Sequence, residues 1–176
     1  MRRVLVVGSG GAGKSTFADA LGAHTGLPVT HLDAHFWKPG WVETPPDEWR
    51  AVQQRLIAAD EWIIDGNYSA TIDVRLPRAD MVILLDMGRV RCVSRVVWRT
   101  LRHHGQARTA AECPDRFDWS FIRNFVWTYP TRSRTKVIAA AEQHRDHLDF
   151  VRLRTPKQVR RFLTDQERTG RAVDDR

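Results

Sequence analysis

The chain has 176 residues, 42% of them hydrophobic, which is enough for one domain with a continuous core. Charged residues make up 28% and apolar runs stay short, so we expect no membrane-spanning helix, no secretory leader and a cytoplasmic location. A formal net charge of +7 favours acidic partners such as phosphates or nucleic acid, and two cysteines exclude a disulfide framework.

Short runs rich in Val and Ile recur along the chain, as in buried parallel strands. They occupy residues 4–7, 28–32, 62–64, 81–85 and 150–153. Helical patterns separate them, so the sequence predicts an α/β fold with a doubly wound parallel sheet.

Two of the predicted helices carry capping signals. Residues 44–47 read Thr-Pro-Pro-Asp and residues 155–158 read Thr-Pro-Lys-Gln, and in each the threonine is interpreted as the N-cap. The polar residues after the second helix are expected to fray. We therefore predict one domain over residues 1–166 and a frayed tail over 167–176.

A glycine-rich segment directly follows the first predicted strand. Gly8-Ser9-Gly10-Gly11-Ala12-Gly13-Lys14-Ser15 has the pattern G-x-x-x-x-G-K-[ST], and a helical pattern starts at Thr16. In such a phosphate loop, glycines let backbone N–H groups turn toward phosphate oxygens, and a lysine reaches the outer phosphates. Residues 8–16 are therefore predicted to bind ATP, with the Ser15 hydroxyl on Mg²⁺.

The same residues also fit the dinucleotide pattern G-x-G-x-x-G. Asp33 lies twenty positions beyond Gly13, where a dinucleotide-binding fold places its ribose-binding acid. The polar run Lys14-Ser15-Thr16 favours the phosphate loop, because a dinucleotide fold would begin packing apolar side chains there. Binding of NAD(H) instead of ATP with Mg²⁺ stays open as an alternative.

A second carboxylate ends the third predicted strand. Asp65 follows the apolar residues 62–64 and precedes Gly66 and Asn67. In a phosphate-loop fold this position lies beside Ser15, so Asp65 is predicted to help hold Mg²⁺. Asp65 could also serve to cap the turn that Gly66 and Asn67 make.

With the phosphate loop, four further segments resemble adenylate-kinase-like proteins called topology modulation proteins, over nearly the whole chain. They are His31-Leu32-Asp33, Phe36-Trp37-Lys38-Pro39-Gly40-Trp41, Asp65-Gly66-Asn67-Tyr68 and Leu76-Pro77-Arg78-Ala79-Asp80. The resemblance, and a more distant one to nucleoside monophosphate kinases, implies a five-stranded parallel sheet, a mobile lid and transfer of the γ-phosphoryl group of ATP. Adenylate kinases continue this Asp-Gly with Phe-Pro-Arg, whose arginine holds the acceptor phosphate. Here Asn67 and Tyr68 follow instead.

A row of arginines follows the fourth predicted strand. They share one face of a helix, opposite Val93, Val96, Val97 and Leu101, and are Arg91, Arg95, Arg99 and Arg102. Such a row is often only a solvated face. In the kinase plan this helix runs toward the lid, and we expect Arg95, Arg99 and Arg102 to stabilise charge on the transferred phosphoryl group.

The lid is expected at about residues 103–130, where periodicity is weak. Resemblance to lid-proximal arginines of the kinases makes Arg132 and Arg134 secondary candidates, with Arg134 on the nucleotide. His103, His104 and Cys113 are too loosely spaced to indicate a lid metal.

The acceptor side is expected around Asp33, at the carboxyl edge of the sheet. A carboxylate there can take the proton of a hydroxyl acceptor, whereas a phosphate acceptor needs no base. Phe36, Trp37 and Trp41 either stack on a flat or sugar-like substrate or form a small core. His31 is interpreted as structural.

The sequence thus predicts an ATP-dependent kinase of an unidentified small molecule, with catalytic residues Lys14, Asp33, Arg95, Arg99 and Arg102. One alternative is a nucleotide-dependent protein that binds nucleic acid, because residues 88–136 hold 11 basic and 3 acidic side chains. Another is a nucleotide-binding regulator without an acceptor. The oligomeric state is not predicted.

Overall fold

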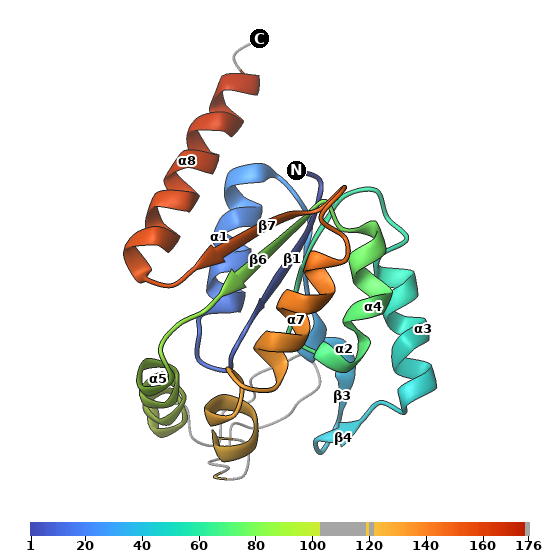
Figure 1. Ribbon diagram of the computed structural model, residues 1–176, viewed down its shortest axis with the longest axis vertical. Coiled ribbons are helices and arrows are strands. Elements are labelled where there is room, and N and C mark those ends of the chain that lie inside the picture. The colour runs from blue at the N-terminus through green and yellow to red at the C-terminus, as the bar shows by residue number, and fades with distance from the viewer. Residues whose placement is uncertain (103–118, 120–121, 175–176) are drawn as a thin grey trace.

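The computed structural model describes residues 1–102, 119 and 122–174 (Figure 1). Five strands form one parallel sheet in the order β2-β5-β1-β6-β7. Their bounds are β1 (Arg3–Gly8), β2 (Val29–His31), β5 (Trp62–Asp65), β6 (Met81–Leu85) and β7 (Asp149–Leu153). The five predicted strands and the α/β class are confirmed.

Helices cover both faces of this sheet (Figure 1). One face carries α1 (Lys14–Thr25) and α8 (Pro156–Asp174), and the other carries α3 (Pro46–Leu56), α4 (Ile72–Arg75) and α7 (Ser133–Glu142). At the carboxyl ends of the strands lie α5 (Arg89–Arg102) and the π-helical segment η3 (Ile122–Trp127). Short elements complete the fold: α2 (Leu32–Phe36), the hairpin β3 (Trp37–Lys38) and β4 (Val42–Glu43), η1 (Ser69–Thr71) and η2 (Leu76–Arg78).

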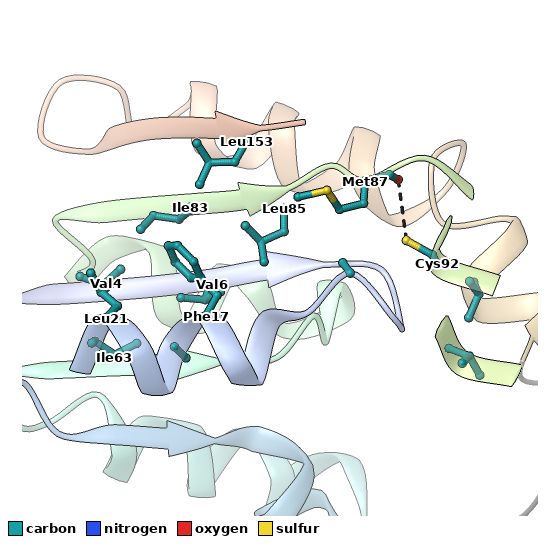
Figure 2. Packing of buried hydrophobic residues seen from close by; sticks show 14 of the residues in the cluster. Val4, Val6, Phe17, Leu21, Ile63, Ile83, Leu85, Met87, Cys92 and Leu153 are labelled. Atoms are coloured by element: carbon teal, nitrogen blue, oxygen red, sulfur yellow. Dashed lines mark hydrogen bonds between the residues drawn. The ribbon is translucent and has the colours of Figure 1, made fainter. Parts of the chain in front are cut away.

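The central strand β1 supplies both halves of the core, because successive side chains of a strand point to opposite faces. Val4 and Val6 join the cluster under α1 and α8, where Phe17 and Leu21 pack on the sheet (Figure 2). Leu5 and Val7 join the cluster under α3, α4 and α7. Both faces of the sheet are thus closed, and its carboxyl edge is left for a site.

The two capping predictions have different outcomes. At α8 the Thr155 hydroxyl accepts from the Gln158 N–H at 3.2 Å, and the Gln158 side chain accepts from the Thr155 N–H at 3.1 Å, so this cap is confirmed. At α3 the prediction is wrong by one residue: the helix begins at Pro46 with Pro45 as its N-cap. The Thr44 hydroxyl instead donates at 2.6 Å to the carbonyl of Phe36, the last residue of α2.

In the structure, α8 extends over Pro156–Asp174, and the expected fraying of residues 167–176 stays a prediction. One expectation about a helix face needs correction. Leu101, expected on the packed face of α5, is 73% exposed, whereas Cys92 and Val96 are buried. Among the described residues, no helix combines the length and apolar character that crossing a membrane requires.

Candidate active site

The phosphate loop connects β1 to α1 at the carboxyl edge of the sheet, and Lys14 is the first residue of α1. Gly11 and Gly13 have φ values of 76° and 93°, a region that disfavours other residues. A Cβ on Gly13 would lie 3.2 Å from Nη1 of Arg95, and a Cβ on Gly11 would meet the backbone of Cys92. The backbone of the loop therefore packs directly against α5, and the lack of a side chain at Gly11 and Gly13 allows this close approach.

The side chains of the loop have distinct positions. Lys14 Nζ donates to the Ser9 carbonyl at 3.1 Å, so the lysine arches over the loop. Ser9 is buried, and its hydroxyl donates to the Val126 carbonyl of η3 at 3.5 Å. Ser15 and Thr16 lie exposed in the first turn of α1. The residues predicted to bind ATP thus lie in one loop and in the first turn of α1, and nucleotide binding by them stays a prediction.

Asp65 ends β5 next to the phosphate loop, and it pairs in register with Val6 of β1. The residue is only 4% exposed, and its Oδ1 atom makes no hydrogen bond, while Oδ2 lies 2.9 Å from Nδ1 of His31. Burial by itself would raise the pKa of Asp65. The hydrogen bond with His31, the charge of Lys14 and the Ser15 hydroxyl outweigh burial, so this pKa lies below its ordinary value.

Ser15 and Asp65 fit a magnesium site. A buried carboxylate oxygen without a protein partner, with a serine hydroxyl beside it, supplies the hard oxygen ligands that Mg²⁺ and its water shell prefer. The structure therefore brings together the two residues that the sequence assigns to the metal.

His31 links Asp65 to α1, a role that the sequence did not reveal. Its Nε2 atom lies 3.1 Å from Oδ1 of Asp19. The hydrogen bond with Asp65 is the main reason that the pKa of His31 is raised. The available signal was register, because His31 and Asp65 are direct partners in the β2–β5 pair.

Asp33 lies in α2, at the end of β2, and its side chain is exposed. The Tyr68 hydroxyl donates a 2.7 Å hydrogen bond to Oδ1 of Asp33. Burial of Tyr68, followed by the negative charge of Asp33, raises the pKa of the tyrosine, so it remains a donor. Tyr68 is a site residue that sequence reasoning missed.

The aromatic residues after β2 contact one another. Phe36 lies 4.9 Å from Trp37 and 4.8 Å from Tyr68, measured between ring centroids, and Trp37 lies 5.3 Å from Trp41. Trp49 of α3 packs 5.1 Å from Phe36. These contacts favour the small core over a stacking platform for substrate.

The predicted arginines are not all at the phosphate loop. Arg95 lies beside Gly13, and Arg99 is half-buried one turn later. Arg102 is exposed at the end of α5, where its guanidinium stacks 4.9 Å from the Trp98 ring centroid. Arg134 donates to Asp86, just beyond β6, at 3.3 Å. Most of the predicted lid, at about residues 103–130, lies outside the described residues. His103, His104 and Cys113 lie outside them as well.

A cavity of about 200 Å³ adjoins the loop. Its walls come from the loop and α1, from Arg95 of α5 and from the start of α8, and include Gly13, Thr16, Pro156 and Val159. The cavity is mostly apolar, and its lining includes two arginines, Arg95 beside Gly13 of the loop and Arg160 of α8.

Comparison with known proteins places the fold. No family model matches the chain, and no curated protein sequence gives a significant match. Three solved structures are similar in fold. A sugar kinase from Janibacter sp. HTCC2649 is 19% identical with a TM-score of 0.53, covering 93% of each chain. A gluconokinase from Sinorhizobium meliloti 1021 is 16% identical with a TM-score of 0.53, covering 98% of this chain and 95% of its own.

The third is shikimate kinase from Acinetobacter baumannii in complex with shikimate. It is 13% identical with a TM-score of 0.56, covering 94% of this chain and 90% of its own. At these identities the likeness concerns the fold alone. The chain therefore has the α/β fold of phosphate-loop kinases, with a five-stranded parallel sheet flanked by helices.

Proposed function

We propose that this protein transfers the γ-phosphoryl group of ATP to a hydroxyl of a small molecule. The observation that carries the proposal is the placement of three groups at one edge of the sheet: the phosphate loop, the buried Asp65 and the tyrosine-held Asp33. The carboxyl edge of a parallel sheet is where such folds bind ligands. The likeness to three small-molecule kinases supports the same reading.

The nucleotide side is built from the loop, α5 and α8. The N–H groups of residues 8–16 bind the phosphates, Lys14 neutralises the outer ones, and Ser15 and Asp65 hold the metal. Mg²⁺, when bound, offsets negative charge on the phosphates. The apolar cavity between Thr16, Arg95 and Pro156 accepts the base, and the Arg95 guanidinium adds charge near the transferred group.

The charges on the acceptor side favour a hydroxyl over a phosphate. Lys38 bonds Glu48 at 2.9 Å, and Arg50 bonds Asp73 at 2.7 Å. Arg75 is fully buried and bonds backbone carbonyls. These three cations are committed to protein groups, whereas the Asp33 carboxylate is exposed and can take a proton from an incoming hydroxyl.

The finer identification as an adenylate-kinase-like topology modulation protein belongs to this proposal. It rests on the sequence segments that resemble that family, and it adds the expectation of a closing lid at about residues 103–130. Arg134 is assigned to the nucleotide only through the same resemblance. Arg99 and Arg102 remain proposed catalytic residues, with Arg99 the better placed because it lies one helical turn beyond Arg95.

The test is phosphoryl transfer from γ-labelled ATP with Mg²⁺ to matched acceptor pairs, each a nucleoside or hexose and its monophosphate. We expect label in a new phosphate ester of an unphosphorylated compound. Label that appears only in nucleoside diphosphates would replace the hydroxyl by a phosphate acceptor. Binding of NAD(H) without ATP would favour a dinucleotide enzyme, and DNA binding that weakens steeply with salt, without transfer, would favour the nucleic-acid alternative.

A further inference from the structure

Arg75 is a fully buried arginine whose hydrogen bonds, among the residues that the structure describes, go to backbone carbonyls and not to a carboxylate. From α4, its Nη1 atom donates to the Gly66 carbonyl at 3.2 Å, and Nη2 donates to the carbonyls of Asn67 and Tyr68 at 3.1 and 3.0 Å. Asp73, in the same helix, pairs with Arg50 instead. Burial lowers the pKa of Arg75 to about 10, so the guanidinium remains charged near neutral pH. A buried cation bonded only to carbonyls is costly, and a compact hydrophobic core does not require it.

The turn that Arg75 holds is strained and tightly packed. Tyr68 has a φ of 26° and a ψ of 56°, although it is not a glycine. A Cβ on Gly66 would lie 2.7 Å from Cβ of Leu32, so the turn is pressed against the first residue of α2. Strained backbone of this kind persists only where its surroundings fix it. The three carbonyl bonds from Arg75 are such a constraint.

The strained residue is also the one that reaches Asp33. The Tyr68 side chain leaves the turn toward α2, where its hydroxyl donates to Oδ1 of Asp33 at 2.7 Å. The Arg75 guanidinium of α4 therefore bonds three consecutive carbonyls of the turn, and the Tyr68 hydroxyl at the end of that turn bonds the candidate base Asp33. Together these hydrogen bonds connect α4 to α2.

We propose that Arg75 is a positioning residue for phosphoryl transfer: its guanidinium fixes the 66–68 turn, and the turn holds the Tyr68 hydroxyl on Asp33. This inference rests on the proposed function, in which Asp33 is the base. Tyr68 fixes one oxygen of Asp33, and the other takes the proton of the acceptor hydroxyl. The acceptor oxygen then bonds the γ-phosphorus while the bond from that phosphorus to ADP breaks.

The test compares Arg75→Lys, Tyr68→Phe and the double variant. Arg78→Lys is the matched control, since Arg78 lies three residues further on and its side chain pairs at 3.6 Å with the exposed Asp60. Hydrogen–deuterium exchange of residues 66–71 reports the turn without reference to activity. ADP formation from Mg·ATP with water as acceptor reports turnover, and the Michaelis constant for ATP reports the nucleotide side.

We expect Arg75→Lys to speed exchange of the 66–71 amides and to lower turnover by about tenfold or more, with little change in the Michaelis constant. Tyr68→Phe should lower turnover to a similar degree. The double variant should lose no more than the worse single variant, because both act through one hydroxyl. Arg78→Lys should change neither measurement.

Unchanged exchange in Arg75→Lys, or losses that multiply in the double variant, would overturn the inference. Full turnover in Tyr68→Phe would overturn it as well. Because Tyr68→Phe leaves the hydrogen bonds of Arg75 in place, this variant still tests the inference if Arg75→Lys does not fold. If the parent protein neither binds ATP nor forms ADP, the proposed function fails. In that case the exchange comparison alone decides whether Arg75 holds the turn.

Discussion

Gly11 of the phosphate loop lies directly against Cys92 of α5: a Cβ atom on Gly11 would collide with the Cys92 carbonyl oxygen and reach 3.0 Å from Cγ2 of Val96. Neither a backbone carbonyl nor a buried valine on the same helix can move aside cheaply. The loop and the arginine helix are thus held at one fixed spacing.

Gly11→Ala should therefore abolish tight ATP binding, because the added methyl group forces the loop and α5 apart. Calorimetric titration with ATP and Mg²⁺ measures the effect. Gly26→Ala is the matched control, since Gly26 has a similar φ of 73° but nothing within 4 Å of its Cβ position. Gly26→Ala should cost about 1 kcal/mol of stability and leave ATP binding intact. Equal ATP affinity in both variants would contradict the packing argument.

Lys14→Ala should lose ATP binding or turnover while the fold remains. The change removes the loop's cation and its bond to the Ser9 carbonyl, but it disturbs no buried apolar contact. Thermal unfolding and ATP titration separate the two effects. Lys136→Ala, at an exposed lysine of α7, is the control. Undiminished turnover in Lys14→Ala would remove the basis of the kinase proposal.

Arg95→Ala and Arg99→Ala should lower turnover by about a hundredfold or more, with smaller changes in the Michaelis constant for ATP. The reason is that Arg95 lies beside Gly13, and charge grows on the phosphoryl oxygens only during transfer. Arg102→Ala tests whether the position of the arginine matters or only its charge. Arg102 carries the same charge as Arg95, but it stacks on the exposed Trp98 ring. Its loss should be smaller; a loss equal to that of Arg95→Ala would mean that the far end of α5 also reaches the phosphates.

Asp33→Asn should lower turnover by about 10² to 10⁴ with a hydroxyl acceptor, while ATP affinity changes little. The substitution keeps the size of the side chain and its bond from Tyr68 but removes the base. Steady-state kinetics at saturating ATP measure the loss. Near-normal turnover would point to a phosphate acceptor, and loss of NAD binding would point to a dinucleotide site.

Acid should weaken the anchor between the first strand and Asp80. The Asp80 carboxylate accepts from the Arg3 N–H at 3.0 Å and from Nη2 of Arg3 at 2.7 Å. Partial burial would raise the pKa of Asp80, but these bonds lower it below its ordinary value. The stabilisation is therefore complete above the unfolded pKa of about 3.9 and is lost as the pH falls through the lower, folded pKa.

Asp80→Asn should accordingly cost about 1 kcal/mol near neutral pH, and the difference from the parent should shrink below about pH 4. Urea unfolding across that range measures both. Asp60→Asn, at a carboxylate 83% exposed, should cost almost nothing at any pH. A constant difference for Asp80→Asn would show that its charge is irrelevant.

The strands and the phosphate loop could be predicted because their signals are local. Each strand of the main sheet is an apolar run between helices, and the loop motif fixes its own geometry. The β3–β4 hairpin was missed because its strands have two residues each, and Trp41 takes a φ of 64° that no sequence pattern announces. The start of α3 was misplaced because the Thr44 hydroxyl is used by Phe36, a contact outside the helix.

The missed site residues act through distant contacts. Tyr68 meets Asp33 across 35 positions, and His31 meets Asp65 across 34. Arg75 reads in the sequence as one more surface charge, since burial of a guanidinium depends on carbonyls that only the folded turn presents. Residue types and spacing therefore predict the phosphate side of the site better than the acceptor side.

The strand order of the sheet also governs when the phosphate loop can form during synthesis. Of the five strands, β1 leaves the ribosome first, yet its two neighbours in the sheet are β5 and β6. Val4 can therefore pair only after Ile63 and Met81 have been synthesised. Until then a buried apolar strand and its glycine-rich loop have no partners, and such unpaired segments are prone to aggregate. The nucleotide can meet an ordered loop only after β6 has docked, so nucleotide supplied during translation should not protect shorter nascent chains.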